Sequence, residues 1–274
     1  MQSGGDAYKL LGRFYWSCLR LKDTEAAKDV AQLEVVKQVF RTEKGHIMNG
    51  YMQILYNNGH YEDLCKVCEE EYGNVRAQLP HFLIAALYRI GTPEAYAKAK
   101  SYDSESQHYR LKLITALFAY HQKDFDFIEE TVKDFSNRLL PGMVPKLPSA
   151  NLHILTMLEK GQLKELLTEL NQWMGQVDEA GSFRLNIMKE VHEKLETAIE
   201  NSKEDGEIQQ LWDAFQHFNH LRYRVDSMTL EEYIFKPMSL APNPRKSKYK
   251  DQLESRNLSR GARIVGSQPD LPPE

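Results

Sequence analysis

The stretch HIMNGYMQILYNNGHYEDLCKVCEEE, which runs from His46 to Glu71, contains the unit from which the fold can be predicted. Its first part has the periodicity of an amphipathic helix of roughly three turns, and it ends at the turn signal Asn58-Gly59. A second and more charged helix follows the turn, with Leu64 on its apolar side. The stretch therefore predicts a helical hairpin.

Similar turn signals recur about every 34 residues, which is a period typical of helical hairpin repeats. They are Lys22-Asp23, Asn58-Gly59, Ile90-Gly91, Lys123-Asp124 and Lys160-Gly161. Helical periodicity extends from residue 6 to about residue 235, and no segment shows sustained strand alternation. One hairpin cannot bury both faces of its helices, so neighbouring hairpins must stack. We expect an all-α fold, a right-handed α-solenoid of about five helix-turn-helix repeats with C-terminal capping helices.

The pattern predicts three parts in the chain. Residues 6–175 are expected to form the array of hairpin repeats, and residues 176–236 a C-terminal helical cap. Pro237 marks the point where regular structure is expected to stop. Residues 237–274 are therefore predicted to be a basic, proline-containing flexible tail.

The expected cap has its own helix signals. Residues 183–200 and 207–224 have the pattern of two longer amphipathic helices. Thr229 and Glu232 have the spacing of a capping box, in which each residue hydrogen-bonds the backbone of the other. This spacing predicts a short final helix that extends through Phe235.

Composition limits the classes of protein to which the chain can belong. With 274 residues, of which 42% are hydrophobic, it can bury a continuous core. The net charge of −4 argues against a uniformly basic surface, so any nucleic-acid binding needs a local patch. The three cysteines, an odd number, favour a reducing compartment. The sequence contains no run of about 18 apolar residues, so it predicts no membrane-spanning helix.

The N-terminal stretch 7–22 is basic and amphipathic, which superficially resembles an organelle transit peptide. Leu10, Leu11, Phe14 and Leu19 continue the core pattern of the later hairpins. We therefore interpret this stretch as a helix of the fold, so that no transit peptide is evident. The first residues also lack the basic and apolar regions of a secretory signal.

Few residues in the chain have the pattern of a catalytic or metal site. Cys65 and Cys68 have metal-ligand spacing, but a structural zinc site needs four ligands and no second pair exists. Asp213, His217 and His220 can share one helix face, where a packing role is the simpler interpretation. Glycine-rich phosphate loops and catalytic nucleophile motifs are absent from the sequence. We expect no enzyme activity, no catalytic residues, no metal site and no cofactor.

Two stretches resemble the motif of the pentatricopeptide repeat family. The opening stretch has Asn49 ten residues before Gly59, and the stretch at Ala150–Leu170 has Asn151 ten residues before Gly161. Most of the chain is similar to metazoan mitochondrial members of this family. The similarity is carried by FYWSCLRLKDTEAAKDV, LYNNGHYEDLCKV, LPHFLIAALYRIGTPEAYAKA and LSRGARI.

The resemblance implies a protein of the mitochondrial matrix that binds single-stranded RNA. It would bind mitochondrial transcripts and act in RNA processing, maturation or stability, in support of the respiratory chain. In such repeats a polar side chain near the start of the groove-lining helix contacts one base. Asn49 and Asn151 match that position, because an amide carries both a donor and an acceptor. An ordinary helix cap is the alternative role for these residues.

Counted in the same way from the other turn signals, the corresponding residues are Arg13, His81 and Ile114. Arg13 and His81 can bond to or stack on a base, whereas Ile114 cannot read one. The acidic run Glu69–Glu71 would repel phosphates, so we expect it on the convex side of the array.

The basic tail is a further candidate for RNA contact. Arg245, Lys246 and Lys248 can bind phosphates, although a solvated flexible tail is the alternative interpretation. An alternative function is a scaffold that binds protein, either a tetratricopeptide-type adaptor or a component of the small mitochondrial ribosomal subunit. The acidic net charge and the irregular repeats favour this alternative.

Overall fold

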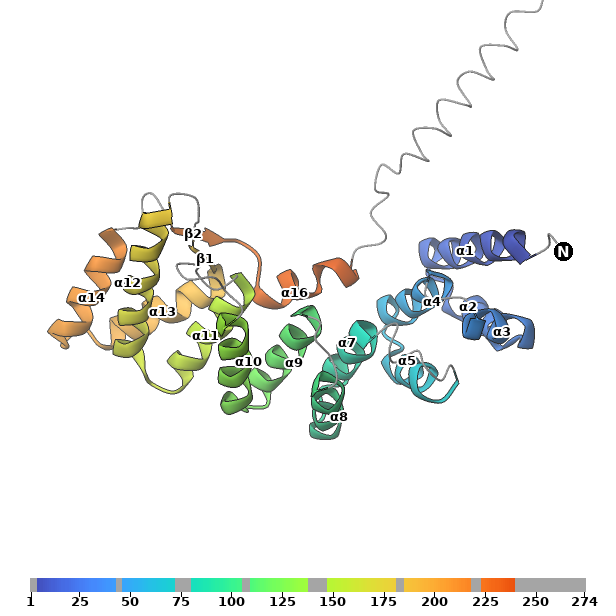
Figure 1. Ribbon diagram of the computed structural model, residues 1–274, viewed down its shortest axis with the longest axis horizontal. Coiled ribbons are helices and arrows are strands. Elements are labelled where there is room, and N and C mark those ends of the chain that lie inside the picture. The colour runs from blue at the N-terminus through green and yellow to red at the C-terminus, as the bar shows by residue number, and fades with distance from the viewer. Residues whose placement is uncertain are drawn as a thin grey trace, which may run out of the picture. The chain divides into compact units, whose positions relative to one another are not determined.

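The structure of the chain is a computed structural model that describes residues 4–42, 46–71, 80–104, 109–137, 147–180, 185–217 and 223–239. All of these residues belong to one compact unit, Met1–Ser239. They are mostly helical, which agrees with the predicted all-α class (Figure 1).

The helices follow one another as hairpins, and we call the first helix of each hairpin the A helix and the second the B helix. The A helices are α1 (Gly4–Leu21), α4 (His46–Asn57), α7 (Pro80–Ile90), α9 (Tyr109–His121), α11 (Leu147–Glu159) and α13 (Lys189–Asn201). The B helices are α2 (Thr24–Gln32), α5 (Tyr61–Lys66), α8 (Pro93–Ser104), α10 (Phe125–Asn137), α12 (Leu163–Ala180) and α14 (Gly206–His217). Leu33 has an extended backbone and separates α2 from α3 (Glu34–Thr42). The helix α5 continues into a π-helical turn, η1 (Val67–Glu71).

Each A helix packs against the A helix of the next hairpin, in the order α1, α4, α7, α9, α11 and α13. The core is therefore continuous along the unit rather than divided between hairpins. Its largest fully buried side chains include Tyr15, Tyr51, Phe118 and Phe215. The N-terminal segment packs against α4, and this agrees with the prediction that residues 7–22 form a helix of the fold.

The turns lie where the sequence predicts them. One residue in each adopts the left-handed conformation: Lys22, Gly59, Gly91, Lys123 and Gly161. In the second hairpin, the amide of His60 donates to the carbonyl of Leu55 (2.9 Å) and the amide of Gly59 to that of Tyr56 (3.2 Å). This is the Schellman arrangement, which needs one left-handed residue after the helix. Glycine adopts this conformation without strain, so three of the turns are marked by glycine.

Several B helices begin at residues whose side chains bond to the first turn of the helix. Asp23 accepts a hydrogen bond from the amide of Ala26 (3.0 Å), and Thr92 accepts one from that of Ala95 (3.1 Å). Such caps satisfy amides that have no partner within the helix. The turn signals of the sequence thus mark both the end of one helix and the start of the next.

Two short parallel strands, β1 (Leu185–Met188) and β2 (Tyr223–Asp226), were not expected from the sequence. They correct the prediction of continuous helices at 183–200 and 207–224, because α13 begins only at Lys189 and α14 ends at His217. The strand β1 is almost wholly buried beside α11. Contacts with a distant helix, rather than local periodicity, therefore determine its conformation.

The last described helix, α16 (Leu230–Ser239), begins with the predicted capping box. The hydroxyl of Thr229 accepts a hydrogen bond from the amide of Glu232 (3.1 Å), and the carboxylate of Glu232 accepts one from the amide of Thr229 (2.9 Å). The helix continues through Pro237, which corrects the expectation that regular structure stops there. Its apolar residues Leu230, Ile234 and Phe235 are buried against the A helices.

Candidate functional site

The structure fixes the register of the hairpins, because the left-handed residue gives each turn a common reference point. Asn49 lies ten residues before Gly59, and we call the corresponding place in each A helix position −10. The residues at position −10 are Gly12, Asn49, His81, Leu113 and Asn151. Arg13 and Ile114 are therefore each one residue away from this position. The prediction had counted from Asp23 and Asp124, which follow the left-handed residues.

Asn151 is buried and holds β1 against α11. Its side chain is 0% exposed, its Oδ1 accepts a hydrogen bond from the amide of Met188 (2.8 Å), and its Nδ2 donates to the carbonyl of Asn186 (3.1 Å). Both polar atoms of the amide are thus used inside the protein. This corrects the expectation that Asn151 lies in a groove and contacts a base.

The A helix α9 is also covered at position −10. Leu113 and Ile114 are both buried, and the buried run continues almost without interruption to Ala119. A helix that is apolar around its whole circumference must be enclosed by other elements. Here α16 packs on both α9 and α11. The C-terminal A helices therefore have no free face at this position.

The helix α16 is anchored by Glu231. Its carboxylate accepts a hydrogen bond from the hydroxyl of Tyr88 (2.8 Å) and pairs with the guanidinium of Arg89, so that α16 lies beside the ends of α7 and α9 (Figure 1). The Tyr88 hydroxyl lies 3.0 Å from Nε2 of His121. Because this hydroxyl gives its only proton to Glu231, Nε2 of His121 must be the donor. Burial would raise the pKa of Glu231, but Tyr88 and Arg89 outweigh it and lower this pKa below the ordinary 4.5.

A surface cleft of about 590 Å³ lies next to this anchor. Its lining includes Arg89, Phe235 and three carboxylates, those of Glu190, Glu231 and Glu232. The guanidinium of Arg89 lies 4.7 Å from the centre of the Phe235 ring. The only cation of the cleft is thus already held by α16, which leaves an acidic opening that would repel a phosphate.

The N-terminal A helices keep position −10 partly exposed. Asn49 on α4 and His81 on α7 are half-buried, and Gly12 on α1 is exposed. The Oδ1 atom of Asn49 is buried and has no hydrogen-bond partner in the described part of the chain. The ring of His81 lies 4.8 Å from that of Phe82. The face is therefore open at α1, α4 and α7.

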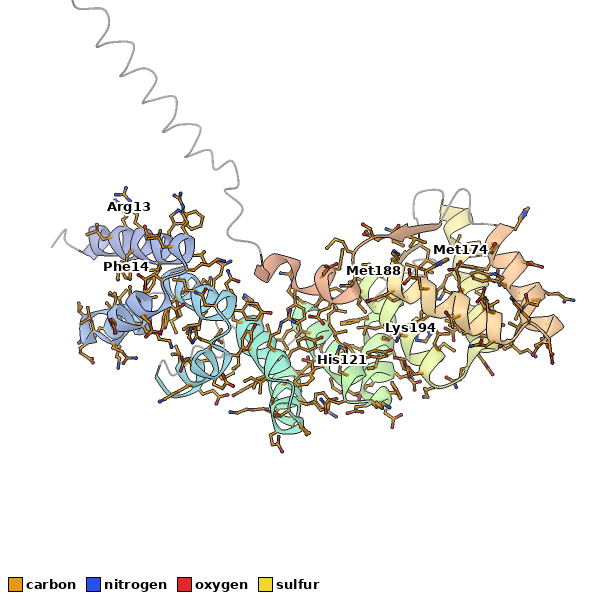
Figure 2. The ribbon with its side chains drawn as sticks, turned by 180° about the vertical axis from the view of Figure 1, so that it is seen from behind. Arg13, Phe14, His121, Met174, Met188 and Lys194 are labelled. Carbon is orange, nitrogen blue, oxygen red and sulfur yellow. The ribbon has the colours of Figure 1, made fainter. Side chains whose placement is uncertain are left out.

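The open face of α1 carries two arginines and a tryptophan. Arg13, Trp16 and Arg20 are exposed, with Trp16 at 38%. In Figure 2 Arg13 points outward and Phe14 points toward the packed helices. Among the described residues, no carboxylate pairs with Arg13 or Arg20. We call Arg13, Trp16 and Arg20 the α1 stripe.

Trp16 and Arg20 were not among the predicted site residues. Their spacing relative to Arg13 is the signal that could have revealed them, because residues at i, i+3 and i+7 share one face of a helix. The absence of any acidic residue between Lys9 and Lys22 is a second signal. Sequence reasoning instead selected Arg13 by its distance from the turn.

Some of the cations outside the A-helix face are neutralised by neighbouring hairpins. On α8, Lys98 pairs with Glu69 (2.6 Å) and Lys100 pairs with Asp124 (2.8 Å), and in the turn after α11 Lys160 pairs with Glu129 (2.5 Å). Glu69 thus lies among the B helices rather than on the A-helix face. Arg13 and Arg20 have no such carboxylate partner in the described part of the chain, which leaves their charge available to a ligand.

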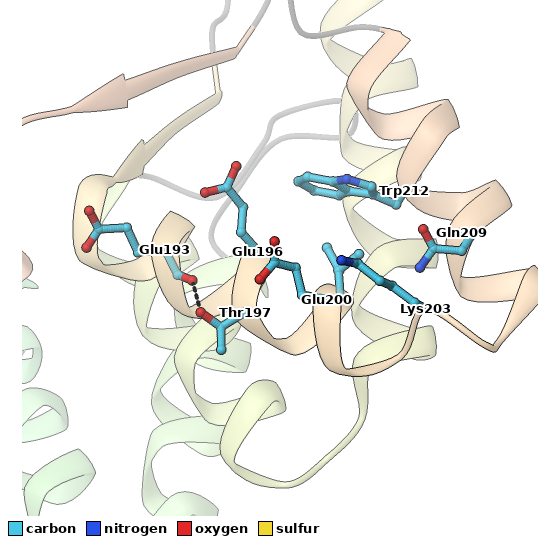
Figure 3. A pocket seen from close by; sticks show the side chains of 8 residues that line it. Glu193, Glu196, Thr197, Glu200, Lys203, Gln209 and Trp212 are labelled. Atoms are coloured by element: carbon cyan, nitrogen blue, oxygen red, sulfur yellow. Dashed lines mark hydrogen bonds between the residues drawn. The ribbon is translucent and has the colours of Figure 1, made fainter.

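A second cleft, of about 430 Å³, lies between α13 and α14. Figure 3 shows Glu193, Glu196 and Glu200 along one side and Trp212 across from them. Lys203 is the single cation that lines it. The carboxylates give this cleft a negative potential, so it is unsuited to nucleic acid.

The cysteines do not form a further candidate site. Cys65 and Cys68 are buried, and the thiol of Cys68 lies 3.7 Å from the sulfur of Met52. Burial raises the pKa of Cys65 to about 12, so its thiol stays protonated and is a poor metal ligand. The described segments contain no group of three or more histidine, cysteine or acidic residues placed to hold a metal. None of the helices described is both long enough and apolar enough to cross a bilayer.

Arg245, Lys246, Lys248 and His220 lie outside the described residues. No family model, curated protein or solved structure matches the chain. A functional assignment must therefore be argued from the residues of the A-helix face.

Proposed function

We propose that this protein binds single-stranded RNA along the open part of its A-helix face, on α1, α4 and α7. The α1 stripe carries this proposal, because its two arginines, which have no acidic partner among the described residues, share one exposed helix face with an aromatic ring. Arginine forms strong, charge-assisted hydrogen bonds with phosphate oxygens. An exposed aromatic ring between them adds a surface on which a base can stack.

Asn49 and His81 would contact bases in the adjacent hairpins. Both are half-buried, so each is held by its helix while part of its surface stays accessible. Because Oδ1 of Asn49 is buried, its amide nitrogen would be the group that donates to a base edge, whereas the imidazole of His81 can bond to a base edge or stack on it. With α1, they supply three neighbouring A helices, which is consistent with repeats that each take one base.

The cellular role that fits this binding is processing, maturation or stabilisation of mitochondrial transcripts, in support of the respiratory chain. This part of the proposal rests on two expectations from the sequence. One is its resemblance to mitochondrial pentatricopeptide repeat proteins, and the other is the solenoid of helical hairpins that it predicts. Crosslinking of RNA to the protein in cells, followed by sequencing, tests it. Recovery of cytosolic transcripts alone would refute the mitochondrial role.

Binding of RNA itself is tested by fluorescence anisotropy of a labelled, unstructured RNA. The variant Arg13→Glu, Arg20→Glu should bind far more weakly than the wild type. Its matched control is Lys66→Glu, Lys133→Glu, which changes the net charge equally at two exposed B-helix positions. Replacing the arginines by alanine should reduce the slope of log K against log salt by about 1.4, since each contact with a single strand contributes roughly 0.7. Equal weakening by both charge-reversal variants would show that only net charge matters.

A protein ligand is the second candidate function, and α16 is the observation that favours it. This amphipathic helix packs on α9 and α11 through buried apolar residues and is anchored to α7 by Glu231. A helix from another protein could pack on α1 and α4 in a similar way, as in helix-in-groove recognition. Affinity purification from cells tests this alternative. Recovery of an adaptor complex or of small-subunit ribosomal proteins by the wild type, but not by the arginine variant, would establish it if the protein also binds no RNA.

A further inference from the structure

In the α1 stripe, Trp16, which carries the indole ring, lies between Arg13 and Arg20 along the helix. At 100° per residue, Arg13, Trp16 and Arg20 lie within about 60° of one another around α1. At 1.5 Å per residue, Trp16 lies roughly 4.5 Å along the helix from Arg13 and roughly 6 Å from Arg20. Two guanidinium groups on flexible side chains can therefore reach on both sides of anything that lies on the indole.

The exposed position of Trp16 is not required by the core. Its neighbours Phe14 and Tyr15 already fill the packed side of α1, where Tyr15 is 2% exposed and stacks with Phe40 at a ring distance of 5.9 Å. Trp16 lies on the other side, at 38% exposure. An exposed indole carries a large apolar area that a ligand can cover.

We propose that Trp16 is a stacking platform for one unpaired nucleobase, and that Arg13 and Arg20 bind the phosphates on either side of it. This inference rests on the proposed function and specifies its ligand. A base within a duplex is stacked between its neighbours and is not free to lie on the indole, so the platform selects single strands. Because every base has a flat face, the platform itself reads no sequence.

Charge complementarity favours this occupant over an apolar one. The stripe is flanked by cations, and α1 has no acidic residue between Lys9 and Lys22. Leu10 and Leu21 are also exposed, at 64% and 76%, but they lie to one side of the stripe at i−3 and i+8 from Arg13. A ligand that needs both stacking and negative charge fits the three residues of the stripe together.

The experiment uses a full chain in which Trp16 is the only tryptophan, made by Trp173→Phe and Trp212→Phe. Three probes are titrated: a short single-stranded RNA, the same RNA as a duplex, and inorganic polyphosphate. We expect strong quenching of Trp16 fluorescence by the single strand and little quenching by the other two. In the wild-type background, Trp16→Ala should weaken single-strand binding roughly 5- to 150-fold, the range for loss of one base stack.

Two variants separate stacking from charge and from loss of folding. Trp16→Phe keeps a ring and should retain most of the affinity, while Trp16→Ala should leave polyphosphate binding unchanged. The matched control is Trp212→Ala, which removes an indole from the acidic cleft and should not change RNA binding. Circular dichroism checks that each variant is helical.

The outcomes are distinguishable. If Trp16→Ala does not weaken RNA binding, and RNA does not quench the fluorescence of Trp16, the stacking platform is overturned and the proposed function stands. No RNA binding at all would overturn both. Quenching by vesicles of phosphatidylcholine and cardiolipin, but not by RNA, would make α1 a membrane-surface helix instead and would likewise overturn both.

Discussion

Replacing Asn151 by alanine tests whether this residue is a structural clamp. The change removes the hydrogen bonds to Met188 and Asn186. The Met188 amide accordingly loses a buried acceptor, and the Asn186 carbonyl loses a donor. Because Asn151 is 0% exposed, water cannot replace the missing amide without opening the contact between α11 and β1.

The cost follows from the number of groups that lose their partners. Each net hydrogen bond contributes about 1 kcal/mol, and a buried group without a partner costs about 1–3 kcal/mol. Two bonds and two backbone groups therefore give a loss of roughly 2–5 kcal/mol in the free energy of unfolding. This is a large fraction of the about 5–15 kcal/mol that stabilises a typical domain.

Asn49→Ala is the matched control, since the same residue type occupies the same position of another A helix. The buried Oδ1 of Asn49 has no partner among the described residues, so its removal should cost less than about 1 kcal/mol. Urea unfolding, followed by circular dichroism, measures both variants. Anisotropy with RNA, under conditions in which both are folded, should show weaker binding only for Asn49→Ala. A stable Asn151→Ala protein that has lost RNA binding would refute the clamp.

Three further predictions concern the anchor of α16, the thiols and the turns. Glu231→Gln should destabilise the fold at neutral pH, and the difference in urea midpoint from wild type should vanish as pH falls below 4.5, because a carboxylate with a lowered pKa stabilises the fold only while ionised. Cys65 and Cys68 should react with iodoacetamide, as seen by mass spectrometry, only after unfolding, since burial raises the pKa of each thiol; rapid labelling of the native protein would contradict this. Gly161→Ala should cost about 1 kcal/mol through backbone strain, since nothing lies within 4 Å of the added methyl group, whereas Lys123→Gly should be neutral or stabilising by up to about 1 kcal/mol in thermal unfolding.

The sequence allowed the turns to be predicted because their chemistry is local. Gly59 and Gly161 are required by a left-handed backbone, and the aspartates after Lys22 and Lys123 cap the helices that follow. The capping box of α16 was predictable for the same reason. In each case the residues that determine the structure lie within a few positions of one another.

The tertiary contacts could not be predicted in this way. Nothing near Leu185 in the sequence shows that this segment is a strand, because its stability depends on Asn151 and on β2. The role of Asn151 was misjudged for the same reason. Both asparagines share a position in their hairpins, but only the one under β1 is covered.

The candidate site was predicted only where it is exposed. Counting back from the turn selected Asn49 and His81, which are partly accessible, and it did not select the charge pattern of α1. The register error at Arg13 arose because lysine, rather than glycine, occupies the left-handed position of that turn. A lysine there gives no conformational signal in the sequence, so the aspartate after it was taken as the reference point.

Position −10 is accessible on the N-terminal A helices and buried on α9 and α11, which limits how many bases the A helices can read. If each hairpin contacts one base, as in helical repeats that read RNA, then among the five hairpins with an assigned position −10 only those that begin with α1, α4 and α7 have it accessible, and on α1 it is Gly12, which has no side chain to read a base. At α9 that position is enclosed in the core, and at α11 it is bonded to β1. Two base-reading side chains, those of Asn49 and His81, carry too little information to select one transcript. Specificity would then have to come from outside this face, through a second RNA contact or a partner protein, while the stripe on α1 would supply affinity for unpaired RNA in general.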